Sequence, residues 1–225
     1  MKRVTIPELL DTDSGTPAEV ASSLCDLRWF NRWFGGTNTT QAMVRAVVGR
    51  SQVSSLSLLE VAAGAGYVPR TIREQMRRDG VGMDVVLLDR ARTHLPSGPQ
   101  NGVRAVAADA GILPFADNSF DVVSSCLFTH HLAGAELVGF VNEALRVCRK
   151  AVLINDLIRH PLHLGLVYAG MPLYRSRITR HDAAASVRQA YTVEEMQRLL
   201  AQTQAVRIDV ERHYLFRMGV VVWKG

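Results

Sequence analysis

Three acidic residues, Glu60, Asp89 and Asp109, each stand at the end of a short apolar run. In an open α/β sheet the carboxyl ends of the strands meet at one edge, and ligands bind there. A carboxylate after the second strand can accept hydrogen bonds from both hydroxyls of a ribose. One such acid alone is equally consistent with a turn or helix-cap role, but acids at three successive strand ends predict a nucleotide-like ligand.

A turn of small residues, Ala62-Ala63-Gly64-Ala65-Gly66, follows the first of these acids. Glycine adopts positive φ at little steric cost and lets a ligand approach the backbone closely. The helix expected next presents free N–H groups at its start. The turn is therefore a second candidate for ligand binding, with a purely structural strand-to-helix turn as the alternative.

A nicotinamide dinucleotide site is a competing interpretation of a glycine turn followed by an acid. That site requires three glycines with the spacing GxGxxG. Ala62 and Tyr67 occupy two of the positions where those glycines would stand. The sequence therefore disfavours a nicotinamide cofactor.

Short apolar runs alternate with helical periods from Leu56 onward, which is typical of an α/β fold with a parallel sheet covered by helices. We expect strands at Ser57–Val61, Asp84–Leu88, Val103–Ala107, Phe120–Ser124 and Ala151–Asn155, and the clearest helix at Ala135–Arg149. Two alternating apolar segments near the C-terminus predict closing antiparallel strands joined by a tight turn near Arg212.

Capping motifs predict helices near both ends of the chain. Thr16, Pro17 and Glu19 form a helix start that leads toward Gly35, and a second helix is expected at about Thr39–Val48. Thr192 and Glu195 form another capping box, which opens a helix to about Ala201. The long segment Leu157–Ser186 interrupts the α/β rhythm, and connections of this length are usually functional or mobile.

The region from about Leu56 to Asp156 resembles the class I S-adenosylmethionine-dependent methyltransferases, especially the branch with small-molecule and quinone methyltransferases. The first motif of that family is an acid followed by alternating glycines. Glu60, Gly64 and Gly66 match it, and Ala62 stands where the first glycine is expected. The resemblance implies S-adenosylmethionine as cofactor and a Rossmann-like, seven-stranded sheet ordered 3-2-1-4-5-7-6 with the last strand antiparallel.

The resemblance also implies a role for each part of the chain. Glu60, Ala62, Gly64 and Gly66 would face the methionine part of the cofactor, Asp89 the ribose, and Asp109 with the Ala110 backbone the adenine, while Ser125 completes the cofactor-binding set. We expect a single domain, with a helical cap or lid over 1–50, a cofactor-binding core over 51–156, a substrate-covering insertion over 157–190, and a C-terminal helix and strand pair over 191–225.

His130 and His131 follow the fourth strand and Asp156 ends the fifth, near where the methyl group should emerge. Methyl transfer from a sulfonium is an in-line displacement, so the protein mainly aligns the acceptor and excludes water. A phenolic acceptor also benefits from a general base, and histidine has a suitable pKa. We expect His131, His130 and Asp156 to be catalytic, with capping or packing of the next helix as the alternative for the histidines.

The substrate would meet residues from both flanking segments. Trp33 and Phe34, beside two glycines, resemble the aromatic lid of small-molecule members, with an ordinary core-covering helix as the alternative. His163 lies in the long insertion, where a solvated surface position is the alternative, and Arg188 lies just before the capped helix. We expect Trp33, Phe34, His163 and Arg188 to contact the substrate.

The distribution of charge along the chain bears on the chemical class of the acceptor molecule. The chain has 225 residues and a formal net charge of +5. Between Arg146 and Ala190, eight basic and two acidic residues give +6, which leaves −1 for the remainder. This excess predicts an acidic or carrier-linked acceptor, with arginine-rich surface composition as the plainer explanation.

Several features are missing from the sequence. The three cysteines have no CxxC spacing, so we expect neither a disulfide framework nor a metal site. No apolar run approaches the roughly 18 residues of a membrane helix and no signal peptide is evident, so we expect a cytoplasmic protein without a membrane partner. After the fourth strand, Ser124-Ser125-Cys126-Leu127 lacks the proline-containing motifs of base methyltransferases.

The sequence predicts a methyltransferase that acts on a small molecule, with O-methylation of an aromatic or polyketide-like hydroxyl favoured. Carbon methylation of a quinone-like ring is the first alternative. A nucleic-acid methyltransferase and a cofactor-binding protein without transfer activity are the alternatives from other classes. The oligomeric state stays open.

Overall fold

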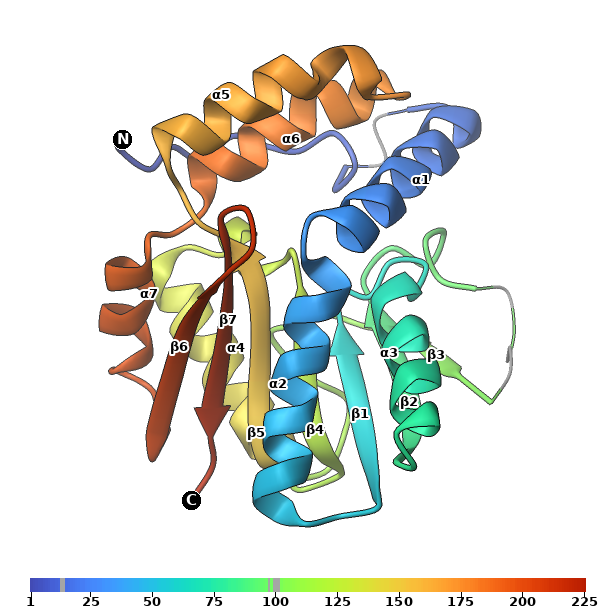
Figure 1. Cartoon of the computed structure of the whole chain (residues 1–225), viewed down its shortest axis with the longest axis vertical. Helices are drawn as coiled ribbons and strands as arrows, with labels where there is room; N and C mark the ends of the chain where they lie inside the picture. Colours follow the sequence, from blue (N-terminus) through green and yellow to red (C-terminus); the bar gives the residue numbers. More distant parts are fainter. Residues whose placement is uncertain (13–14, 97, 99–101) are drawn as a thin grey trace.

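Seven strands form one sheet in the order β3-β2-β1-β4-β5-β7-β6 in the computed structural model, which describes residues 1–12, 15–96, 98 and 102–225 (Figure 1). The strands are β1 (Ser55–Val61), β2 (Gly82–Asp89), β3 (Arg104–Ala107), β4 (Phe120–Cys126), β5 (Cys148–Leu157), β6 (Arg207–His213) and β7 (Arg217–Trp223). The first five are parallel, and β7 runs antiparallel to both β5 and β6. The predicted order and the antiparallel last strand are confirmed.

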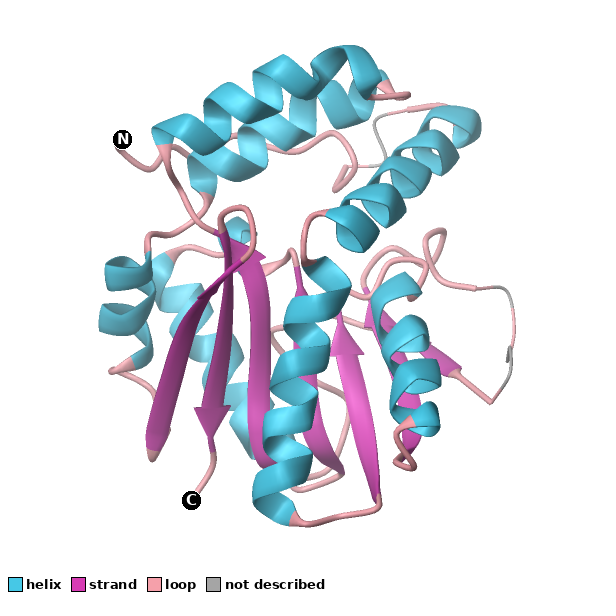
Figure 2. Cartoon of the chain, viewed as in Figure 1, coloured by secondary structure: helices cyan, strands magenta, loops and turns pink. Residues whose placement is uncertain are grey.

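Helices cover both faces of this sheet (Figure 2). On one face lie α2 (Gly36–Ser51) and α3 (Tyr67–Arg78), and on the other lie α4 (Gly134–Val147) and α7 (Val193–Leu200). Successive residues of a strand point to opposite faces, so in β5 Leu153 packs into the core beneath α2 and α3, whereas Val152 and Ile154 pack into the core beneath α4. Because the strands are buried on both faces of the sheet, their sequences are continuous apolar runs.

The remaining helices gather beyond the carboxyl ends of the parallel strands (Figure 1). They are α1 (Pro17–Trp33), α5 (Pro161–Gly170) and α6 (Arg177–Gln189), with the short helices η1 (Thr129–His131) and η2 (Met171–Leu173). Asp26 on α1 ties this group together, because its Oδ2 accepts from the backbone N–H groups of Arg175 at 2.9 Å and Ser176 at 3.2 Å. The insertion therefore packs on the N-terminal helix and covers the ligand-binding edge.

Two buried polar residues fix the junction between α1 and α2 to the sheet. Asn155 on β5 donates to the Gly36 carbonyl at 2.6 Å and to the Thr40 hydroxyl at 2.8 Å. Arg217, which is 2% exposed, donates to Asn155 Oδ1 at 3.1 Å and to the Phe34 carbonyl at 3.2 Å. The end of α1 thus has a defined position over the site.

Several predicted boundaries were wrong. The helix expected at Ala135–Arg149 ends at Val147, and Cys148 and Arg149 already belong to β5. Cys148 fits both patterns because it is apolar and fully buried, so periodicity could not place the switch. The turn between the last two strands begins after His213, slightly later than the predicted position near Arg212. Leu215 and Phe216 adopt positive φ in this turn. Among the described residues, no helix is long and apolar enough to cross a membrane.

Candidate functional site

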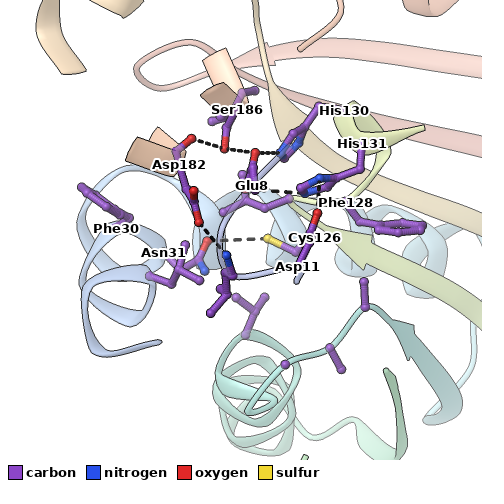
Figure 3. Close-up of a pocket in the computed structure, with 18 of the residues that line it drawn as sticks. Glu8, Asp11, Phe30, Asn31, Cys126, Phe128, His130, His131, Asp182 and Ser186 are labelled. Atoms are coloured by element: carbon purple, nitrogen blue, oxygen red, sulfur yellow. Dashed lines mark hydrogen bonds and ion pairs between the residues drawn. The ribbon is translucent and has the colours of Figure 1, made fainter. Parts of the chain in front are cut away.

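A cavity of about 1350 Å³ lies between the carboxyl ends of the strands and the helices above them. Pockets for a single small ligand are usually about 300 to 1,000 Å³. The lining includes the β1 turn, the ends of β2 and β4, η1, and residues of the N-terminal segment, α1, α5 and α6 (Figure 3). The cavity therefore has room for two ligands side by side.

The backbone conformation of the turn after β1 explains why its residues are small. Ala62, Gly64 and Gly66 all have positive φ, at 55°, 50° and 70°. A Cβ at Gly66 would overlap the Leu87 side chain, whereas a Cβ at Gly64 would meet no atom within 4 Å. Gly66 is therefore required for packing, and Gly64 leaves its space to the cavity that it lines.

Ala62 occupies a left-handed conformation that costs an L-residue about 1 to 2 kcal/mol. Because glycine also loses more backbone entropy on folding, Ala62→Gly is expected to raise the free energy of unfolding by about 0.5 to 1 kcal/mol. Urea denaturation measures the change. Ala65, which does not adopt positive φ, is the matched control. Ala65→Gly is expected to lower stability by roughly 0.5 to 1 kcal/mol, and equal effects at both positions would contradict the strain at Ala62.

The acids of β2 and β3 also reach the cavity. Asp89 Oδ2 accepts from the Gly64 N–H at 2.8 Å, and its Oδ1 accepts from the Ala91 N–H at 2.9 Å. Asp109 is exposed and accepts from the Gly111 N–H at 2.7 Å. Asp89, Asp109 and Ala110 all line the cavity. Asp89 thus braces the glycine turn and offers its carboxylate to a ligand at the same time.

Glu60 lies deeper, at the end of β1, where it is 2% exposed and lines the cavity. Burial disfavours its charged form and raises the pKa of Glu60 to about 7. Its Oε2 has no hydrogen-bond partner among the described residues. A buried carboxylate oxygen without a hydrogen-bond partner lowers the stability of the fold. A hydrogen-bond donor or cation of a ligand would satisfy this oxygen. Ser125 is also buried, but it lies outside the cavity lining.

His130 and Asp156 form a buried pair at the cavity wall, which His130 lines and Asp156 does not. His130 Nδ1 lies 2.7 Å from Asp156 Oδ1, and Asp156 Oδ2 accepts from the Thr129 hydroxyl at 2.5 Å and the His130 N–H at 3.0 Å. Burial opposes the imidazolium, but Asp156 and Glu8 outweigh it and raise the pKa of His130 to about 10. Although it is buried, the Asp156 carboxyl has a pKa below its usual range because of His130. Asp156 is only 1% exposed and lies outside the cavity lining, so it positions η1 rather than facing the cavity as a catalytic residue would.

The N-terminal segment brings Glu8 and Asp11 to the two histidines (Figure 3). His131 Nδ1 lies 2.9 Å from Asp11 Oδ2, and its Nε2 lies 3.9 Å from Glu8 Oε2. Glu8 is 8% exposed and its Oε1 accepts from the Ser186 hydroxyl at 2.6 Å and the Gln189 amide at 2.8 Å. Sequence reasoning missed Glu8 and Asp11, because no motif marks them and only the fold brings them to η1.

Glu8, His130 and His131 are also arranged so that they could hold a metal ion. One ligand atom from each of the three residues lies within 4.8 Å of the others. We call these three residues the acceptor-end cluster. All three line the cavity, so a bound ion would face its interior.

The substrate residues expected from the sequence divide into two groups. Phe34 and His163 line the cavity, and His163 stacks on Phe216 with ring centroids 5.1 Å apart. The expectation for the other two is not met: Trp33 is 59% exposed and outside the lining, and Arg188 donates to the Tyr168 hydroxyl at 2.8 Å instead. A helix has more than one face, and sequence position alone did not show which face of α1 or α6 meets the cavity.

The arginines of the insertion are engaged elsewhere. Arg159 is 6% exposed and pairs with Glu195 at 2.6 Å, and Arg177 pairs with Glu19 at 2.5 Å. Neither residue lines the described cavity, and neither do Arg175 and Arg180. The side of the cavity next to these helices is instead largely apolar, with Leu24, Leu27, Phe30, Leu166, Val167 and Leu173.

Comparison with known proteins gives a family match for the central part of the chain. The methyltransferase domain family matches residues 59–154, a segment that contains Glu60, Asp89, Asp109 and both histidines of η1. Among curated proteins, none matches the sequence.

Solved structures share the fold at low sequence identity. The plantazolicin methyltransferase BpumL, in complex with a monoazolic desmethylPZN analog and SAH, is 10% identical with a TM-score of 0.68, and the match covers 92% of this chain and 91% of that chain. The magnesium protoporphyrin IX methyltransferase from Synechocystis PCC 6803, with bound SAH, is 12% identical with a TM-score of 0.57, at 85% and 84% coverage. The CurJ carbon methyltransferase is 11% identical with a TM-score of 0.58, at 84% and 54% coverage.

These neighbours establish the fold, and the family match establishes that its central segment is a methyltransferase domain. The strand order is the one expected of this fold, and the family match contains the acids that follow β1, β2 and β3. Residues 59–154 thus match a methyltransferase domain, and the chain as a whole has the fold seen in these methyltransferase structures.

Proposed function

We propose that this enzyme methylates the hydroxyl of a small aromatic or polyketide-like acceptor, with S-adenosylmethionine as methyl donor. The observation that carries the proposal is a single cavity with two unlike ends. One end has the glycine turn and the strand-end acids. The other has apolar side chains around the acceptor-end cluster, which suits a mainly apolar molecule with one polar group.

The first end fits the cofactor on three counts. Gly64 leaves open space where a side chain would stand, and Glu60 Oε2 lacks a partner there. Asp89 is held at the end of β2, where a carboxylate binds ribose hydroxyls. We assign Glu60, Ala62, Gly64 and Gly66 to the methionine part, Asp89 to the ribose, and Asp109 with Ala110 to the adenine. Because Ser125 is buried behind this surface, its contribution is to packing.

The second end supplies the groups that prepare the acceptor. When bound, the cofactor supplies an electrophilic methyl group on a sulfonium. The protein has to align the acceptor oxygen and remove its proton. His131 is the more exposed of the two histidines, at 19% against 2%, and Asp11 orients its ring from Nδ1. We assign it the role of proton acceptor, and we assign His130 and Asp156 the role of holding η1 in place.

Methyl transfer to a panel of phenols, aryl carboxylic acids and enolisable ketones tests the proposal. Labelled S-adenosylmethionine and mass spectrometry of the products would show which atom receives the methyl group. We expect O-methylated phenols. If the protein instead methylates ring carbon with comparable or higher kcat/KM, or methylates RNA, the proposed acceptor class is wrong.

The raised pKa of Glu60 gives a pH-dependent stability. Its folded-state pKa of about 7 lies above the ordinary value of 4.5, so the stabilisation is present below pH 4.5 and is lost as the pH rises through 7. The shift corresponds to about 3 kcal/mol. We therefore expect the wild type to lose about this much unfolding free energy relative to Glu60→Gln between pH 5 and pH 8. A constant difference between the two proteins in urea titrations would refute the shift.

Ligand binding should show the opposite trend. If the ionised Glu60 pairs with the ammonium of S-adenosylhomocysteine, affinity scales with the ionised fraction, which rises about tenfold between pH 5.5 and pH 7. This window lies below the α-amino pKa of about 7.7 to 8.0, so the ligand stays cationic. Calorimetry is expected to show this gain in the wild type and a flat profile in Glu60→Gln. Parallel profiles would remove Glu60 from the methionine contact.

A further inference from the structure

We propose that the acceptor-end cluster of Glu8, His130 and His131 is a binding site for one divalent transition-metal cation. Figure 3 shows the Glu8 carboxylate next to both imidazoles, at the side of the cavity formed by η1 and α6. The three residues come from the N-terminal segment and from η1, so the site exists only in the folded chain.

The spacing of the ligand atoms suits a common ion. Zinc binds imidazole nitrogen at about 2.0 to 2.1 Å and carboxylate oxygen at about 2.0 to 2.2 Å, so two ligands of one tetrahedral ion lie roughly 3.3 to 3.5 Å apart. His130 Nε2 lies 3.4 Å from Glu8 Oε1, and His131 Nε2 lies 3.9 Å from Glu8 Oε2. The first separation fits, and the second requires His131 to approach Glu8 by about 0.4 Å.

The Nε2 atom of His130 is incompletely satisfied. The His130 side chain is 2% exposed, and among the described residues the acidic group nearest to Nε2 is Glu8 Oε1 at 3.4 Å, which does not meet hydrogen-bond geometry. Buried polar atoms nearly always have a hydrogen-bond partner. Because Asp156 and Glu8 favour the protonated imidazole, a cation would bind Nε2 by displacing its proton to solvent, while Nδ1 keeps its hydrogen bond to Asp156.

Each of the three ligands already has the outer partner that metal ligands usually have. Metal-binding histidines donate their second ring N–H to a carboxylate or carbonyl, and ligating carboxylates are hydrogen-bonded in turn. Asp156 stands 2.7 Å from His130 Nδ1, and Asp11 stands 2.9 Å from His131 Nδ1. Ser186 and Gln189 donate to Glu8 Oε1, the oxygen nearest His130, and Oε2 is the oxygen nearest His131, so both oxygens of this carboxylate would face the ion.

The ligand types select the class of metal. Two imidazoles and one carboxylate suit zinc, iron, cobalt or nickel, whereas magnesium and calcium prefer oxygen ligands alone. Glu8, Asp11 and Asp156 place three carboxylates around the two imidazoles, and a divalent cation would offset that negative charge. Three protein ligands also leave at least one coordination position open toward the cavity.

The role of such an ion rests on the proposed function, but its presence does not. An acceptor hydroxyl that reaches this end of the cavity would bind the open position, and coordination lowers the pKa of a bound oxygen. In the metal-loaded protein His131 would be a ligand, the cation would replace it in activating the hydroxyl, and the hydroxyl proton would pass to solvent.

Titration of the chelator-treated full chain with Co²⁺ and Zn²⁺ tests the site. We expect one Co²⁺ per chain by calorimetry, with visible d–d absorption of a nitrogen- and oxygen-ligated ion, and displacement by Zn²⁺. His131→Gln and Glu8→Gln remove ligands and are expected to weaken Co²⁺ binding at least 100-fold, and Asp11→Asn, which removes an outer partner, by about 10- to 100-fold.

His213→Gln is the matched control, because His213 also lies near a carboxylate, Glu211 at 3.8 Å, but is not part of the cavity lining. It is expected to leave Co²⁺ binding unchanged. Binding of S-adenosylhomocysteine and the thermal midpoint establish that each variant is folded. Absence of stoichiometric binding to folded wild type, or equal affinity in His131→Gln, would overturn the site. Loss of S-adenosylhomocysteine binding in the wild type would instead count against the cofactor assignment.

Discussion

Asp89→Ala is expected to weaken S-adenosylhomocysteine binding by about 100-fold or more. A hydrogen bond to a charged group contributes about 1.5 to 3 kcal/mol, and we assign two such bonds from the ribose to this carboxylate. The substitution also removes the acceptor of the Gly64 N–H, so the turn that faces the methionine part loses its brace. Isothermal titration calorimetry measures the change directly.

Asp109→Ala is the comparison for this prediction. Asp109 also lines the cavity, but it is exposed, and among the described residues the hydrogen bond to its Oδ1 comes from the Gly111 N–H. Water competes for an exposed carboxylate, so we expect a loss of less than about tenfold. If Asp89→Ala binds the ligand as tightly as the wild type while remaining folded, the cofactor lies elsewhere in the cavity.

His131→Gln is expected to lower kcat for a phenolic acceptor by about 100- to 10,000-fold, the usual contribution of a general base. S-adenosylhomocysteine affinity is expected to stay within about twofold, because His131 belongs to the opposite end of the cavity from the glycine turn. Steady-state kinetics with a phenol identified in the panel gives kcat, and calorimetry gives the affinity. Full turnover in this variant would remove His131 from the reaction.

Chelation separates the two ways in which His131 can act. If the imidazole takes the proton unaided, chelator-treated wild type keeps its turnover. If the cation activates the hydroxyl, turnover falls on chelation and returns when Zn²⁺ or Co²⁺ is restored. In either case Asp11→Asn is expected to lower kcat less than His131→Gln does, because Asp11 only orients the ring.

The sheet could be predicted well because its strands are buried on both faces. Runs such as Leu58-Leu59 in β1 and Val122-Val123 in β4 fill the two cores alternately, so they are apolar throughout and easy to recognise. The glycine turn was predicted for the right reason, since Gly64 and Gly66 adopt positive φ. Ala62 occupies a position where the family motif has a glycine. Its φ of 55° is in the left-handed region, which glycine adopts more easily than alanine.

The acceptor side of the cavity could not be predicted to the same depth. Glu8 and Asp11 precede the first helix in a segment without periodicity or motif, and only tertiary packing brings them to His130 and His131. Trp33 and Phe34 are neighbours in sequence, yet Phe34 lines the cavity and Trp33 does not. Their side chains leave the backbone in different directions at the end of α1. The sequence also did not show that Arg159 and Arg177 would be paired with acids, which removes them from the acceptor site.

The central claim is that one cavity holds the cofactor at the strand-end acids and the acceptor at the cluster of Glu8, His130 and His131. A crystal structure with S-adenosylhomocysteine bound tests it most directly. The account predicts ribose hydroxyls within hydrogen-bond distance of Asp89, and a sulfur that faces the space between His131 and the apolar residues of α1 and α5. A ligand whose ribose lies away from Asp89, or whose sulfur points away from His131, would contradict it.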